Sequence, residues 1–151
     1  MTSSVTPIHF VYGLYLRSLA LGRINVKTHV IKGLLCTAGY VPNQHTHEFK
    51  NSVDHETTGS GYAPGGQVIT GIDTIYTGSA KKLTITAGTL NWPVVTFNPG
   101  VRYLVVYDDS WPDQTNKPLM MYVDFGADQL PNNQAFYYQW PGNVMMEIAL
   151  P

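Results

Sequence analysis

Hydrophobic and polar positions alternate along most of the chain with the two-residue period of β-strands. In residues 81–87 (KKLTITA), the apolar side chains Leu83, Ile85 and Ala87 are separated by threonine. Because successive side chains of a strand point to opposite faces, this pattern predicts a strand with one buried face. Residues 102–107 (RYLVVY) are apolar almost throughout, which predicts a central strand covered on both faces.

Turn signals divide much of the remaining chain into further short strands. Gly71 is expected to interrupt one of them, Pro93 places an edge or a bulge in another, and the polar residues 43–59 predict a long loop. Strands that recur every ~8–12 residues, without alternating helices, predict an all-β fold, an antiparallel β-sandwich of jelly-roll or immunoglobulin-like type. These further strands are expected at residues 29–37, 67–76, 90–97, 119–125, 134–140 and 144–150.

Residues 9–21 are the segment with the best helical pattern. Val11, Tyr15 and Leu19 recur every four positions, which gives one broad apolar face. Gly22 follows directly, and glycine is common just beyond the last residue of a helix. We therefore expect one short N-terminal helix that either caps an open end of the sandwich or docks on a neighbouring subunit.

The length of 151 residues fits a single domain. Within it we expect an N-terminal arm and helix at residues 1–22 and a β-sandwich at residues 23–151. The single cysteine, Cys36, lies in an apolar run and is expected to be a small buried side chain. With one cysteine the chain forms no internal disulfide, so its fold does not depend on an oxidising compartment.

Charged residues are scarce in this chain and change the picture of its partners. They make up 13% of the sequence, against roughly 25% in an average soluble domain. The net charge is −1 and the nine lysines and arginines are dispersed, so nucleic acid is not an expected partner. The apolar stretch before Gly22 contains Arg17 and falls short of the ~20 residues that span a bilayer, so no membrane contact is expected. Low charge and many tyrosines are typical of protein interfaces.

The polar segment at residues 43–56 (NQHTHEFKNSVDHE) holds the sharpest candidate chemistry. On a strand, His45 and His47 would share one face, and two imidazoles with a nearby carboxylate can hold a divalent metal. Gly39 and these histidines match the start of the cupin metal motif, but Asn51 and Ser52 occupy the positions of its glutamate. We therefore expect no bound metal and no cofactor, with His45 and His47 as the only candidate ligands. A nucleophile elbow is also missing, so we expect no catalytic residue and no enzyme.

Aromatic residues supply the candidate contact sites. Trp92, Trp111 and Trp140 each precede a proline, an arrangement typical of strand ends and loop tips. Together with Tyr12 and Tyr15 in the predicted helix, Trp111 and Trp140 are the candidate interaction residues. They are expected to contact either a partner protein or a carbohydrate.

Four segments, in order along the chain, resemble small proteins encoded in the genomes of tailed bacteriophages. The similarity extends over residues 12–148 and implies a virion structural protein, with no catalytic residues to transfer. At His45 the family pattern usually has aspartate. The resembling segments are residues 31–49 (with PNQ and THEF), 59–66 (GSGY and GG), 101–108 (VRY and VYD) and 117–129 (KPL, YVDFG and DQ).

The resemblance, the low charge and the aromatic content together predict a capsid decoration or cement protein. Such a protein is made in the host cytoplasm and sits on the outer surface of the virion. Its partners would be the major capsid protein and further copies of itself, as a homo-oligomer or as lattice neighbours. The alternatives are a tail or head-fibre adhesion module that binds host surface carbohydrate, and a cupin-like metal-binding protein.

Overall fold

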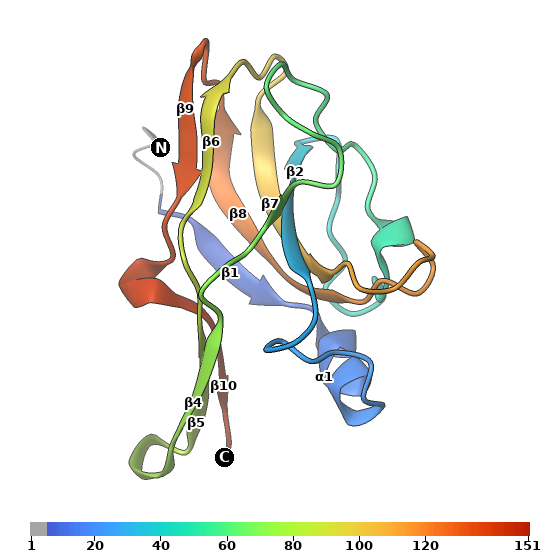
Figure 1. The fold of residues 1–151 in the computed structure, drawn as a ribbon, viewed down its shortest axis with the longest axis vertical. Helices are drawn as coiled ribbons and strands as arrows, with labels where there is room; N and C mark the ends of the chain where they lie inside the picture. Colours follow the sequence, from blue (N-terminus) through green and yellow to red (C-terminus); the bar gives the residue numbers. More distant parts are fainter. Residues whose placement is uncertain (1–5) are drawn as a thin grey trace.

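The computed structural model describes residues 6–151 and is mostly β, with antiparallel sheets and one α-helix (Figure 1). The prediction of a β-rich chain with one short N-terminal helix is confirmed. Three short 3-10 turns lie between strands, at Lys50–Ser52, Gly78–Ala80 and Pro141–Asn143.

The main sheet has five strands, and every neighbouring pair is antiparallel. Its order is β1-β8-β7-β2-β3. The strands are β1 (Ile8–Val11), β2 (Ile31–Thr37), β3 (Gln67–Val68), β7 (Val101–Asp108) and β8 (Leu119–Gln129).

The central strand β7 is buried on both faces, as its sequence predicts. Leu104 and Val106 belong to a large core on one side, and Val105 and Tyr107 belong to a smaller cluster on the other. The smaller cluster also contains Cys36, whose side chain is fully buried. Both expectations for this region, a doubly covered strand and a buried cysteine, are confirmed.

A two-stranded ribbon of β6 (Leu90–Val95) and β9 (Gln134–Tyr138) covers the large-core face of the main sheet. Aromatic rings fill the space between them, with Phe125 of β8 at 5.7 Å from Phe136 of β9, centroid to centroid. The pairing of β6 with β9 shifts register between Trp92 and Val95. This irregularity includes Pro93, because proline lacks the N–H that a continuous ladder requires.

The N-terminal segment differs from the prediction. Helix α1 (Gly13–Ala20) is shorter than expected, and the residues before it form β1, which pairs with residues 121–124 of β8. The side chains of residues 9–11 are apolar or aromatic without a break, so they suit an edge strand as well as a helix turn. Gly22 follows the helix with a φ of +67°, as the glycine signal predicts. Residues 1–5 of the predicted arm lie outside the described part of the chain.

The remaining strands form a separate sheet that extends away from the main sheet (Figure 1). We call it the projecting sheet. It consists of β4 (Asp73–Thr77), β5 (Lys82–Thr86) and β10 (Val144–Ala149), in the order β10-β5-β4. Gly71 separates β3 from β4 with a φ of +66°, which explains why the expected strand at residues 67–76 is interrupted there.

Candidate functional site

Three of the four candidate interaction residues are buried. The exposed fractions of Tyr12, Tyr15 and Trp140 are 0%, 1% and 1%. The Tyr12 and Tyr40 hydroxyls lie 2.8 Å apart, and the Trp140 indole N–H donates to the Gly88 carbonyl at 3.0 Å. These side chains complete the core and have no surface to offer a partner.

His45 and His47 do not lie on a strand, which corrects the geometry assumed for a metal site. The Asn43 side chain accepts the backbone N–H groups of His45 and Thr46, at 3.0 and 3.1 Å, and so closes a turn. Nδ1 of His47 lies 3.0 Å from the Tyr40 hydroxyl and 3.3 Å from the Asn43 backbone nitrogen. Burial lowers the pKa of His47, although the charge of Asp54 opposes this shift.

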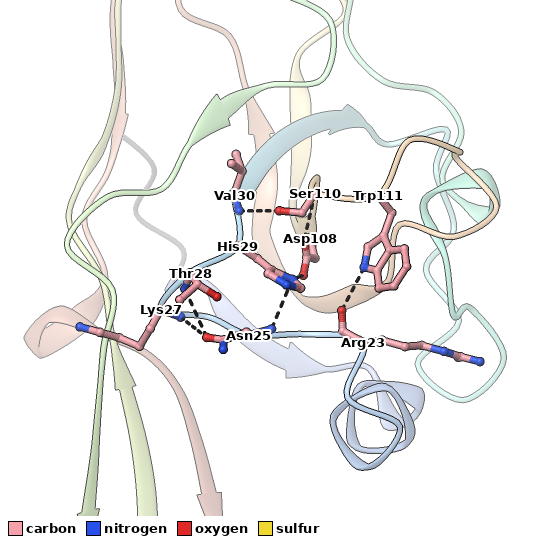
Figure 2. Close-up of polar contacts among 9 residues, drawn as sticks. All are labelled: Arg23, Asn25, Lys27, Thr28, His29, Val30, Asp108, Ser110 and Trp111. Atoms are coloured by element: carbon pink, nitrogen blue, oxygen red, sulfur yellow. Dashed lines mark hydrogen bonds and ion pairs between the residues drawn. The ribbon is translucent and has the colours of Figure 1, made fainter.

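Trp111 is the candidate that stays near the surface. Its indole N–H donates to the Arg23 carbonyl at 2.9 Å (Figure 2). Arg23, Phe49, Trp111 and Asn116 line a hollow of about 160 Å³. The Arg23 guanidinium lies over the Phe49 ring at 5.4 Å and bonds to Glu48 at 2.8 Å. The hollow therefore offers aromatic faces and polar groups at one place.

The residues predicted from the sequence to form a site do not include a buried aspartate near Trp111. Asp108 is fully buried at the end of β7, and its Oδ2 lies 2.5 Å from Nδ1 of His29 (Figure 2). Its Oδ1 accepts the Ser110 backbone N–H at 2.9 Å, and the Ser110 hydroxyl accepts the Val30 N–H at 2.8 Å. We call these contacts the loop clasp, because they join the segment before β2 to the end of β7. Because the Ser110 hydroxyl is bonded to the Val30 backbone, we interpret the loop clasp as a structural contact and not as a catalytic group.

A hollow with a volume of about 420 Å³ lies between β1 and β10. We call it the β1–β10 groove. Its surface is mostly apolar, and His9 and Glu147 are its titratable members. Burial lowers the pKa of His9, whose Nε2 bonds to the Tyr138 hydroxyl. The groove is lined by Pro7, His9, Val11, Met121, Pro141, Val144, Met145, Met146 and Glu147.

The projecting sheet continues from this groove through β10. All five residues of β4 are exposed, and Ile75 and Tyr76 are 54% and 57% exposed. Leu150, just after β10, is 57% exposed. Ile75 and Tyr76 are adjacent on β4, so each face of the projecting sheet carries one of these exposed apolar side chains.

Within residues 6–151, no group of three or more His, Cys, Asp or Glu side chains is placed to hold a metal ion. No helix in the same residues is long and apolar enough to cross a membrane. No family model matches the chain. The curated proteins and the solved structures likewise contain no match to it.

Proposed function

We propose that this protein is a virion structural protein of a tailed bacteriophage, a capsid decoration or cement protein that binds the outer surface of the major capsid protein lattice. The observation that carries the proposal is the mostly apolar β1–β10 groove, which adjoins a projecting sheet with exposed Ile75, Tyr76 and Leu150 side chains. Interface centres are depleted in charged residues in the same way. The order of phage-like segments along the sequence supports the same assignment.

The proposal includes a body of β-sandwich type, jelly-roll or immunoglobulin-like. The β6–β9 ribbon and the main sheet pack face to face over the aromatic core, as the two layers of a sandwich do. A packed core of this kind keeps its shape when force is transmitted through it, because protein interiors are close-packed. This property suits a protein that reinforces a shell.

Cementing a head requires many modest contacts. A protein that binds each lattice site weakly is still retained when it bridges neighbouring subunits, because the second contact forms at high effective concentration. The β1–β10 groove would receive a segment of the major capsid protein. The projecting sheet extends away from the body and would contact neighbouring copies.

The test uses purified heads stripped of this protein. Re-addition should saturate at hundreds of copies per head and raise the temperature at which heads release their DNA. A handful of copies would place the protein in the tail. Stripped heads that are as heat-resistant as intact ones would refute the cement role.

A matched pair of variants tests the groove. Pro141→Glu places a charge in the groove lining, while Pro112→Glu places the same charge at an exposed position on the loop that carries Trp111. The first variant should bind stripped heads at least tenfold more weakly than the second. Equal binding of both would show that the groove is not the capsid contact.

The hollow beside Trp111 favours a second candidate function, adhesion to host surface carbohydrate. Aromatic faces next to arginine and asparagine side chains suit a sugar ring and its hydroxyls. Titration with host polysaccharide should then give saturable binding that Trp111→Ala removes and Tyr76→Ala preserves. No binding by the wild-type protein would end this alternative.

A further inference from the structure

The edge strand β4 leaves part of its backbone free. Among the described residues its hydrogen-bonded neighbour is β5 alone, and all five of its side chains are exposed. The Thr74 N–H is donated to the Asp73 carboxylate at 2.9 Å and not to β5. Antiparallel hydrogen bonds alternate along a strand, so Thr74 and Tyr76 direct their N–H and C=O groups away from the sheet.

No element within residues 6–151 other than β5 pairs with or covers the outer half of β4. Natural sheets usually blunt an exposed edge with lysine, proline, a bulge or a covering loop. Lys27 bonds to the Ile72 carbonyl and to Asp73, both at 3.3 Å, and so covers the end of β4 nearest the body. Beyond this point the sequence is Thr74-Ile75-Tyr76-Thr77, which has no charge, no proline and high strand propensity.

We propose that two copies of this protein pair through β4, antiparallel and about a two-fold axis at Ile75. In this register Thr74 of each copy lies opposite Tyr76 of the other. In each such pair the Tyr76 N–H donates to the Thr74 carbonyl, and the Thr74 N–H exchanges the Asp73 carboxylate for the Tyr76 carbonyl, because these are the residues whose polar groups face outward. The two Ile75 side chains meet directly across the axis and cover each other. The two projecting sheets become one continuous sheet.

The charges on the projecting sheet fit this register. Asp73 of one copy lies opposite the uncharged Thr77 of the other. Thr77 is in turn paired with Lys82 on β5, so the next side chain in that row is a cation. No like charges face each other directly, which would otherwise disfavour the pair. The self-pairing is independent of the proposed capsid role, since isolated protein is sufficient to form it.

A cysteine placed at the axis tests the register. Opposite residues in a non-hydrogen-bonded pair have Cα atoms about 4.5 Å apart, which is within the range that a disulfide spans. Oxidation should therefore convert Ile75→Cys into a covalent dimer. Thr77→Cys is the matched control on the same strand and face, but its two copies would lie about 14 Å apart at 3.4 Å per residue. Cys36 does not interfere because it is buried, which raises the pKa of its thiol.

We expect the Ile75→Cys dimer to form at least tenfold faster than the Thr77→Cys dimer. Equal rates, or no cross-linking at Ile75→Cys, would overturn the proposed register.

Sedimentation of the wild-type protein should show a concentration-dependent dimer. Tyr76→Pro removes one outward N–H that β5 does not use, and should weaken the dimer at least tenfold while leaving the circular dichroism spectrum unchanged. A wild-type protein that stays monomeric at millimolar concentration, or a dimer unaffected by Tyr76→Pro, would overturn the pairing. Both outcomes leave binding to stripped heads as a separate result.

Discussion

Removing one partner of the loop clasp should destabilise the protein by an amount that depends on which partner is removed. Asp108 is fully buried and its carboxylate accepts from two groups, at 2.5 Å from His29 and 2.9 Å from Ser110. A hydrogen bond to a charged group contributes about 1.5–3 kcal/mol. In Asp108→Ala, the His29 ring, which is 28% exposed, and the exposed Ser110 can form hydrogen bonds with water instead. These new bonds offset part of the lost free energy. The net loss should be about 2–4 kcal/mol.

His29→Ala is expected to cost more, because it leaves the Asp108 carboxylate buried with one remaining donor. Removing one member of a buried charged pair costs about 3–5 kcal/mol. Asp108→Asn keeps the acceptor for the Ser110 N–H and should cost about 1 kcal/mol. The double variant, His29→Ala with Asp108→Asn, has no uncompensated buried charge. It should therefore be more stable than His29→Ala alone.

Chemical denaturation followed by tryptophan fluorescence measures these differences directly. In thermal unfolding, each 1 kcal/mol corresponds to about 2–4 °C for a domain of this size, so Asp108→Ala should melt about 4–16 °C below the wild type. A double variant that is less stable than His29→Ala would refute the reasoning, since neutralising an uncompensated buried charge must then be unfavourable. An Asp108→Ala protein within 0.5 kcal/mol of the wild type would show that the clasp contributes little.

Three further predictions concern backbone, core and pH. Gly66→Ala should cost about 3 kcal/mol or more, because at a φ of +77° the new Cβ would lie 1.9 Å from the Gly33 carbonyl oxygen; Gly142→Ala, with open space around it, should cost only about 1 kcal/mol in the same denaturation assay. Trp140→Ala should cost about 3–5 kcal/mol, and clearly more than Trp111→Ala, because Trp140 is 1% exposed. Burial alone would raise the pKa of Asp109, but Lys117 and Lys32, at 2.5 and 2.8 Å, hold that pKa below its ordinary value. As the pH falls below about 4, Asp109 therefore becomes protonated in the unfolded chain before it does in the folded protein. The stability that the ionised Asp109 contributes at neutral pH is lost as the pH falls through its lower folded pKa. Asp109→Asn should therefore show a smaller drop in melting temperature between pH 5 and pH 2 than the wild type, and an equal drop would contradict this.

The elements that sequence reasoning found correctly have local causes. The strand at Lys82–Thr86 follows from alternation over five residues. The break at Gly71 and the irregularity at Pro93 follow from what glycine permits and proline forbids at their own positions. Each signal lies within the segment that it describes, so tertiary contacts are not needed to interpret it.

The errors have causes that lie elsewhere in the chain. Residues 8–11 form a strand because β8 offers them an open edge, more than 100 residues away in sequence. Tyr12 and Trp140 are adjacent to turn signals, yet neighbours from other elements bury them. The prediction of a shared strand face for His45 and His47 failed because the Asn43 side chain closes a turn instead.

The loop clasp could not be predicted for the same reason. His29 and Asp108 are separated by 79 positions. His29 stands in no recognisable motif, and the VYD segment that ends at Asp108 does not indicate its partner. They meet because β2 and β7 pair in a register that aligns Ile31 with Asp108. Predicting this contact requires the register of the strands, and register depends on the whole hydrophobic pattern of both.

The projecting sheet shows where an apolar pattern continues beyond the core that accounts for it. Thr74, Ile85 and Met146 form one row across its three strands, and Tyr76, Leu83 and Ile148 form the next row on the same face. In the first row Ile85 and Met146 are buried, while in the second Leu83 and Ile148 are half-buried and Tyr76 is exposed. Alternation in a strand reflects burial of one face. Its persistence toward the tip of the sheet would be accounted for by the proposed contact of this sheet with a neighbouring copy, because antiparallel pairing through β4 would bring that copy to the same end of the sheet.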